Sequence, residues 1–217
     1  MKTELEQILP EKIEERSFEI ISEELNALFP EKTFLPGEEL ILKRVIHTTA
    51  DFDYAENLIF SEGAVEQALE ALKSGAVIIT DTNMGKAGIN KKSLERLGGE
   101  VLCFMADNDV AEKARQKGTT RASASMDKAA ELGRDCIIAV GNAPTALVRL
   151  FELIQEGRLA PKLIIGVPVG FVNVVQSKEL ILSLKDIPYI VARGRKGGSN
   201  VAAAICNGLI YQLARER

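Results

Sequence analysis

Five short apolar runs recur along the sequence, and stretches with helical patterning separate them. The runs occupy residues 76–80, 100–105, 136–140, 163–167 and 189–192. Short, nearly all-apolar runs are typical of strands buried on both faces of a sheet. Strands that alternate with helices form parallel sheets, because a parallel connection needs a crossover. The chain is therefore predicted to be α/β, a three-layer domain with a mainly parallel five-stranded sheet and helices on both faces.

The first sixty residues lack such runs and predict two extra N-terminal helices. Pro10 suits the first turn of a helix that continues to about Phe29, where apolar residues recur at helical spacing. Residues 30–37 interrupt this pattern, and a second helix is expected from near Glu38 to about His47. No linker or repeat divides the chain, so residues 1–217 are expected to form one domain.

Helix start signals recur between the predicted strands. Ser61, Asn90 and Ser199 can each cap a helix, and Pro144 suits a first helical turn. The expected helices cover about 61–73, 90–98, 109–117, 122–132, 144–156, 173–184 and the segment from Ser199 to the C-terminus.

Charge and composition argue against a nucleic-acid partner. The 27 basic and 31 acidic residues give a formal net charge of −4, tryptophan is absent, and aromatic residues make up 5%. Nucleic-acid-binding proteins usually carry a basic excess and aromatic stacking surfaces. No segment approaches the roughly 20 apolar residues needed to span a bilayer, and no signal peptide is evident. We expect a cytoplasmic protein with no membrane partner.

The cysteines do not predict a metal site. Cys103, Cys136 and Cys206 are scattered, form no C-x-x-C motif, and accompany a single histidine. A structural zinc site is therefore not expected, and an odd number of apolar-flanked cysteines fits a reducing compartment.

Four of the five predicted strands lead into glycine-bearing loops. These loops begin near Thr80, Gly141, Gly166 and Gly194. Ligands of parallel sheets bind beyond the carboxyl ends of the strands, and helix N-termini there favour anions. One such loop would be an ordinary turn, but four together favour an anionic ligand. The P-loop, G-x-G-x-x-G and G-x-S-x-G patterns are absent, so a nucleotide enzyme and a serine hydrolase are weakly supported.

His47 is the only histidine, and histidine is the side chain that titrates near neutrality. It is a candidate proton donor, although a lone histidine is often only a hydrogen-bonded structural residue. The hydroxyls of Thr48 and Thr49 either orient its imidazole or cap the helix end. Arg121 either ends a solvated helix or holds a carboxylate with its planar guanidinium.

Six segments spread over nearly the whole chain form a recognisable set: Arg16-Ser-Phe, His47-Thr-Thr-Ala-Asp, Thr80-Asp-Thr-Asn-Met, Gly141-Asn-Ala-Pro-Thr-Ala-Leu, Pro168-Val-Gly-Phe-Val and Gly194-Arg-Lys-Gly-Gly-Ser-Asn-Val-Ala. In this order they resemble the precorrin-8X methylmutase family, whose anaerobic-pathway members are cobalt-precorrin-8 methylmutases. Gln176 departs from the family's frequent Glu.

The resemblance implies an isomerase of cobalamin biosynthesis. Such enzymes move a methyl group from C11 to C12 of a corrinoid macrocycle, giving hydrogenobyrinate or cobyrinate. They use no cofactor and act as homodimers, with the site near the subunit interface. The family's histidine corresponds to His47 and its substrate-binding arginine to Arg121. A non-catalytic tetrapyrrole carrier and a phosphate- or nucleotide-dependent transferase are the alternatives.

The candidate site combines the loops with this resemblance. His47 is the expected catalytic residue, with no metal ligands. Met84, Phe171 and Val172 could support a macrocycle, or they could pack in the core or the loops. The expected substrate contacts are Ser17, Thr48, Thr49, Asp81, Met84, Arg121, Gly141, Asn142, Ala143, Pro144, Thr145, Gly170, Phe171, Arg195, Lys196, Gly197, Gly198 and Ser199.

Overall fold

The sheet in the computed structural model, which describes residues 6–214, has six strands in the order β1-β6-β5-β4-β2-β3. Five are parallel, and β1 pairs antiparallel with β6 at one edge. The strands are β1 (Leu58–Phe60), β2 (Val77–Thr80), β3 (Val101–Leu102), β4 (Cys136–Val140), β5 (Leu163–Gly166) and β6 (Tyr189–Ala192).

The α/β prediction is confirmed, with a correction to the strand count. The prediction of five strands missed β1, a three-residue edge strand whose Ile59 and Phe60 are only half-buried. Such a short segment gives no clear periodic signal. The predicted strand at 100–105 shrinks to two residues, because β3 pairs only with β2 and lies at the opposite edge.

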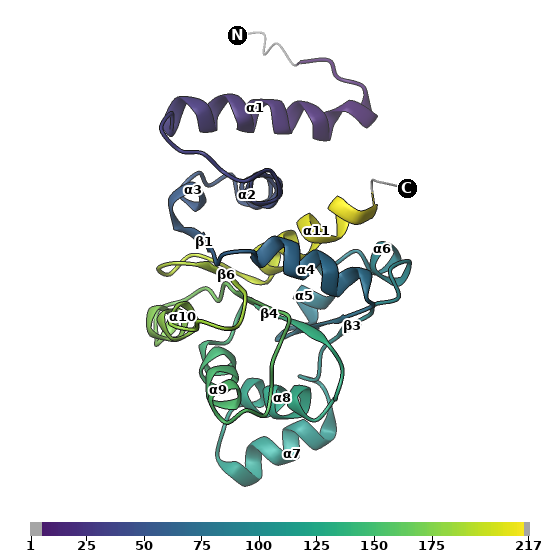
Figure 1. The fold of residues 1–217 in the computed structure, drawn as a ribbon, viewed down its shortest axis with the longest axis vertical. Helices are drawn as coiled ribbons and strands as arrows, with labels where there is room; N and C mark the ends of the chain where they lie inside the picture. Colours follow the sequence, from purple (N-terminus) through teal and green to yellow (C-terminus); the bar gives the residue numbers. More distant parts are fainter. Residues whose placement is uncertain (1–5, 215–217) are drawn as a thin grey trace, which may run out of the picture.

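Side chains of the central strands alternate between two buried cores. In β2, Val77 and Ile79 face one core and Ile78 faces the other. One face is covered by α7 (Asn108–Lys117), α8 (Arg121–Ala130), α9 (Pro144–Gln155) and α10 (Val174–Leu182). The other face is covered by α4 (Ala64–Lys73), α5 (Asn83–Gly88), α6 (Lys91–Glu95) and α11 (Ser199–Ala214), as Figure 1 shows.

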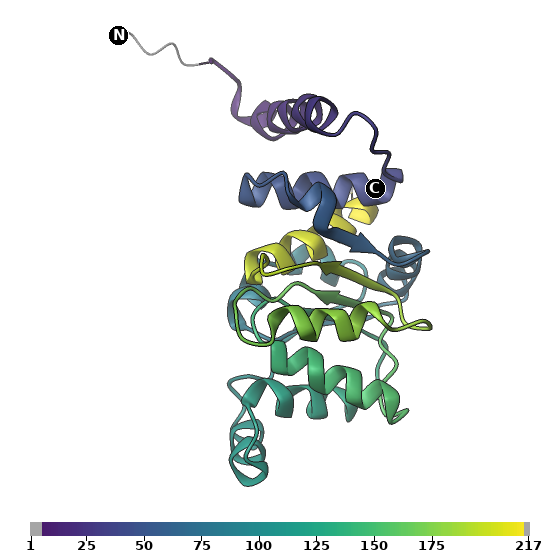
Figure 2. The same cartoon turned by 90° about the vertical axis from the view of Figure 1, so that its left-hand side faces the viewer.

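The two predicted N-terminal helices stack outside α11. The helix α2 (Pro36–Thr49) packs along α11 and buries Ile41, Leu42, Val45 and Ile46. The helix α1 (Ile13–Leu28) follows a short 3₁₀ helix (Pro10–Lys12) and lies outermost, in purple in Figure 2. The short α3 (Tyr54–Asn57), which was not predicted, connects α2 to β1.

Helix starts agree with the sequence at some positions and not at others. Asn90 caps α6 as predicted, because its side chain accepts the Ser93 N–H. Ser61 does not cap α4, which begins after Gly63. The Ser61 hydroxyl instead accepts the N–H of Tyr189, so it joins β1 to β6. Residues 215–217 of the predicted last helix lie outside the described residues. Within residues 6–214, no helix has both the length and the apolar character needed to cross a membrane.

Candidate active site

The loops that follow β2, β4 and β6 touch one another at the carboxyl ends of the parallel strands, which we call the carboxyl edge of the sheet. The Gly141 backbone packs directly on the start of α11, where an added Cβ would lie 2.7 Å from the Cα of Ser199. The hydroxyl of Ser199 lies 2.7 Å from that of Thr82, which caps α5. The glycine at 141 therefore permits an approach that no side chain would allow.

A buried carboxylate holds the loop after β4. Asp81 is 1% exposed and accepts the N–H groups of Gly141, Asn142 and Ala143 at 2.9, 2.8 and 2.7 Å. Burial raises the pKa of Asp81, and the three hydrogen bonds oppose that rise. The predicted anion-binding N–H groups at 141–143 thus already serve an internal carboxylate, and Asp81 is not at the surface to meet a ligand.

The start of α8 lies beside the start of α9. The hydroxyl of Thr145 lies 2.9 Å from that of Thr120, and the Ser123 hydroxyl donates to the Thr145 carbonyl. Pro144 occupies the first turn of α9, as predicted. Because Arg121 directly follows the cap residue Thr120, its exposed side chain starts from the same edge as the 141–145 loop.

An exposed apolar surface lies next to a guanidinium in the loops after β5 and β6. Phe171 and Val172 are each 79% exposed, and the Arg195 guanidinium lies 5.2 Å from the Phe171 ring centroid. The Gly170 N–H donates to the Arg195 carbonyl, which joins the two loops. Met84 in α5 is 72% exposed. This exposure contradicts core packing as the explanation for these apolar residues.

An ion-pair cluster links the β6–α11 loop to the end of α2. The Lys196 ammonium lies 2.6 Å from the carboxylates of both Asp51 and Asp53. These pairs raise the pKa of Lys196, and for Asp51 they outweigh burial and leave its pKa lowered. Lys196 was predicted to contact substrate, but its charge is already balanced by two carboxylates of the chain.

His47 lies in the last turn of α2, just before this cluster, and it is exposed. Its ring centroid lies 5.4 Å from that of Phe18, which comes from α1. Thr48 and Thr49 donate their hydroxyls to the carbonyls of Arg44 and Val45. These bonds correspond to the helix-end alternative, because they do not involve the imidazole.

Ser17, the remaining predicted contact, precedes Phe18 on α1. Its hydroxyl donates to the Ile13 carbonyl one turn earlier. The edge therefore brings together most of the predicted residues, whereas Ser17 takes part in its own helix and Asp81 lies beneath the surface.

Comparison with known proteins identifies the family. A family model described as precorrin-8X methylmutase (CbiC) matches residues 12–212. The chain belongs to the precorrin-8X methylmutase family.

Individual relatives agree with this assignment. The cobalt-precorrin-8 methylmutase of Salmonella typhimurium is 47% identical over 206 residues, covering 94% of this chain and 96% of the relative. That of Priestia megaterium is 42% identical over 202 residues, covering 93% and 88%. A crystal structure of precorrin-8X methylmutase from Thermus thermophilus superposes with a TM-score of 0.86 at 42% identity, covering 95% and 97%. The resemblance seen in the sequence motifs is thus confirmed.

Two residues at this methylmutase edge were not predicted from the sequence. Lys178 of α10 is 0% exposed, and its ammonium donates to the carbonyls of Gly194 and Lys196. Phe18 contacts His47, although it belongs to the outermost helix. Phe18 lies in a segment that carries the family resemblance, and Lys178 follows another one closely. This closeness to the motifs was the only feature of the sequence that could have indicated a role for either residue.

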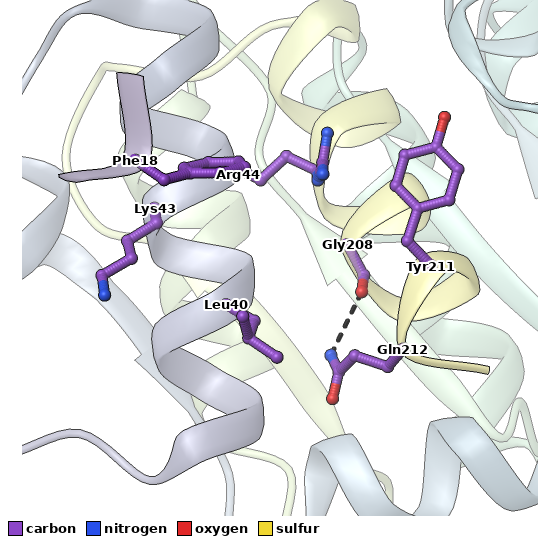
Figure 3. A pocket seen from close by; sticks show the side chains of 7 residues that line it. All are labelled: Phe18, Leu40, Lys43, Arg44, Gly208, Tyr211 and Gln212. Carbon is purple, nitrogen blue, oxygen red and sulfur yellow. Dashed lines mark hydrogen bonds between the residues drawn. The ribbon is translucent and has the colours of Figure 1, made fainter. Parts of the chain in front are cut away.

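A cavity of about 370 Å³ lies between α1, α2 and α11, away from the glycine-bearing loops. Figure 3 shows the Arg44 side chain reaching between Phe18 and Tyr211, with ring centroids 5.3 and 4.6 Å from the guanidinium carbon. Arg44 pairs with Glu14 at 2.9 Å and Lys43 with Glu39 at 2.6 Å. Because its two cations are already paired, this cavity is poorly suited to a polycarboxylate.

Metal-binding side chains do not gather at the edge. Over the described part of the chain, no group of three or more His, Cys, Asp or Glu side chains could hold an ion.

Proposed function

We propose that the carboxyl edge of the sheet is the active site of a cobalamin-biosynthesis methylmutase. The family reaction is an isomerisation in which a methyl group moves from C11 to C12 of the corrinoid macrocycle, giving cobyrinate or hydrogenobyrinate. The observation that carries the proposal is the meeting of the loops after β2, β4 and β6 beside the α2 turn that holds His47.

His47 is the proton donor in this proposal. The C11–methyl bond breaks and the C12–methyl bond forms within one molecule, so the reaction needs no net proton. His47 donates a proton to the macrocycle as the methyl group migrates and takes one back afterwards, which biases the conjugated system towards the rearranged ring. Its exposed position leaves the imidazole open to a ligand, and the Phe18 ring supports it from α1.

The same edge offers two kinds of contact that suit the substrate. The exposed guanidinium groups of Arg121 and Arg195 can each hold a carboxylate in two hydrogen bonds. Met84, Phe171 and Val172 present apolar surface to the flat macrocycle. The binding face also includes the side chains of Asn142 and Thr145.

Cobalt-precorrin-8 is the proposed natural substrate, and precorrin-8X is the alternative. Both curated relatives described above are named for the cobalt form. Parallel assays with the two compounds at equal concentration separate them. A kcat/KM at least as high for the metal-free compound would contradict this choice.

The enzyme is proposed to act in the cytoplasm as a symmetric homodimer whose two sites lie near the subunit interface. Two-fold dimers are the commonest closed oligomers, and Phe171 and Val172 leave apolar surface uncovered on one chain. We further propose that residues 1–217 form one domain, which the family match over 12–212 supports. Sedimentation at micromolar concentration should show a dimer, and a fully active monomer would contradict it.

Replacement of His47 tests the proposed chemistry. His47→Ala and His47→Asn should fold and bind product, but their single-turnover rates should fall about 10²–10⁴-fold, as expected for a positioned acid–base group. Glu39→Ala is the control on the same helix, because it removes only an ion pair with Lys43 about two turns before His47, and it should stay within about threefold of the parent. Rates of both His47 variants within that range would exclude His47 as donor. If the parent binds product without turnover, the carrier alternative holds.

A further inference from the structure

Lys178 is a charged side chain buried without a carboxylate partner among the described residues. Its ammonium donates to the Gly194 carbonyl at 2.9 Å and to the Lys196 carbonyl at 2.8 Å. Burial lowers the pKa of Lys178 to about 8. Burying an ammonium is costly, and an apolar side chain of similar size would fill this space without that cost. The cost makes a role beyond space filling the better explanation.

The two accepted carbonyls fix the direction of two peptide groups. The described peptide bonds are all trans, so each C=O points opposite to the N–H of the same peptide group. The Gly194 and Lys196 carbonyls point inward to Lys178, and the N–H groups of Arg195 and Gly197 therefore point away from it. Neither of these N–H groups has a hydrogen-bond acceptor among residues 6–214.

Contacts other than those of Lys178 also hold the loop after β6. The Gly198 N–H donates to the Val167 carbonyl at 2.8 Å, and the Gly170 N–H donates to the Arg195 carbonyl at 3.2 Å. The ion pairs of Lys196 with Asp51 and Asp53 hold its outer side. Lys178 adds the orientation of the peptide groups on either side of Arg195.

We propose that Lys178 is a positioning residue for substrate binding, which turns the Arg195 and Gly197 N–H groups toward a carboxylate of the corrinoid. This inference rests on the proposed function and extends it to a residue that does not touch the substrate. The carboxylate would accept two backbone N–H groups beside the Arg195 guanidinium, and the buried ammonium would add positive charge beneath it.

Two measurements test the role of Lys178. In the first, hydrogenobyrinic acid, the metal-free product, is titrated into ¹⁵N-labelled parent protein, and the amide protons of Arg195 and Gly197 should move downfield. In the second, Lys178→Met should raise the product Kd and the substrate KM about tenfold, the loss of a charged hydrogen bond. Its kcat should stay within about threefold, because the contact is equal in ground and transition states.

Lys162→Met is the matched control. It removes the same charge just before β5, at the amino ends of the strands and so on the far side of the sheet from the proposed site. Lys162 there pairs with Asp135 at 3.4 Å. It should leave Kd and KM within about twofold of the parent, as expected for an exposed pair. A purely structural role of Lys178 would instead lower kcat through loss of active enzyme and leave KM unchanged.

The outcomes separate this inference from the function on which it rests. If the parent binds neither hydrogenobyrinic acid nor cobyrinic acid, both the proposed function and the proposed role of Lys178 are contradicted. If the parent binds but the two amide signals stay fixed at saturation, or Lys178→Met binds as tightly as the parent, only the Lys178 inference falls. If Lys178→Met does not fold, Lys178→Gln replaces it, and the amide titration of the parent decides without any variant.

Discussion

Two glycine-bearing loops meet at the carboxyl edge, and buried groups of opposite charge hold them. The loop at 141–143 is held through its N–H groups by the carboxylate of Asp81. The loop at 194–197 is held through its carbonyls by the ammonium of Lys178. Although both loops follow a strand and lead into a helix, the first directs its N–H groups inward and the second directs them outward.

Glycines alone therefore do not make a loop an anion-binding site. The buried partner decides which polar groups of the backbone remain available, because each peptide group points its N–H and C=O in opposite directions. In the proposed site, the loop after β4 therefore contributes side chains such as Asn142 and Thr145, whereas the loop after β6 contributes backbone donors. Replacing each partner tests the comparison.

The largest loss of stability is expected for Asp81→Ala. The substitution leaves three buried or half-buried N–H groups without their acceptor, at roughly 1–3 kcal/mol each if water does not replace it. Because water can reach the half-buried N–H groups of Asn142 and Ala143, the free energy of unfolding should fall by the lower part of that sum, roughly 3–5 kcal/mol in urea titrations. The exposed Asp186→Ala is the control and should stay within about 0.5 kcal/mol. A loss below about 1 kcal/mol would show that Asp81 does not hold this loop.

Gly197→Ala should have the next largest effect. A Cβ there would lie 2.1 Å from the Val167 carbonyl oxygen, at a φ of 154°. The loop must shift, so we expect a loss of roughly 2–3 kcal/mol in the free energy of unfolding, together with weaker product binding. Gly133→Ala, at φ 64° with open space around it, should cost only about 1 kcal/mol and leave binding intact. Equal losses in both variants would contradict a special constraint at 197.

Lys178→Met should change stability least at pH 7, by about 1 kcal/mol, since removing the buried charge offsets the lost hydrogen bonds. Its effect should depend on pH. Between pH 8 and 10.5 the unfolded chain keeps the lysine proton and the folded chain releases it. The parent therefore gains stability relative to the variant as pH rises through this window.

Urea titrations of both proteins across this range measure the difference. Burial raises the pKa of Cys136 to about 11 and of Tyr54 to about 12, but these groups are common to both proteins and cancel. A difference that stays constant between pH 8 and 10.5 would contradict the lowered pKa of Lys178.

The sequence predicted the parts of the fold that local pattern determines. The β-branched runs at 77–80 and 136–140 are buried throughout, and their apolar pattern was sufficient to place them. The edge strand β1 was missed because three residues, of which only Leu58 is buried, are too few to show a periodic pattern. The family resemblance and its motifs led to the correct family and most of the loops now found at one edge.

The internal partners of these loops could not be predicted from the sequence. Asp81 meets Gly141 only because β2 lies beside β4 in the sheet. The order of the strands cannot be derived from the local pattern of apolar residues. A lysine within a helical segment normally indicates a solvent-facing position, so nothing marked Lys178 as buried. The Thr48 and Thr49 hydroxyls could not be assigned between two local alternatives until their acceptors were known.

The pairing of α2 with α11 has a consequence for synthesis of the chain. The side chains of Ile41, Leu42, Val45 and Ile46 are made early, yet the helix that covers them begins only at Ser199. Because domains emerge from the ribosome N-terminus first, this apolar helix face waits uncovered while more than a hundred residues are added. Until α11 emerges, this uncovered face exposes the nascent chain to aggregation and to chaperone binding.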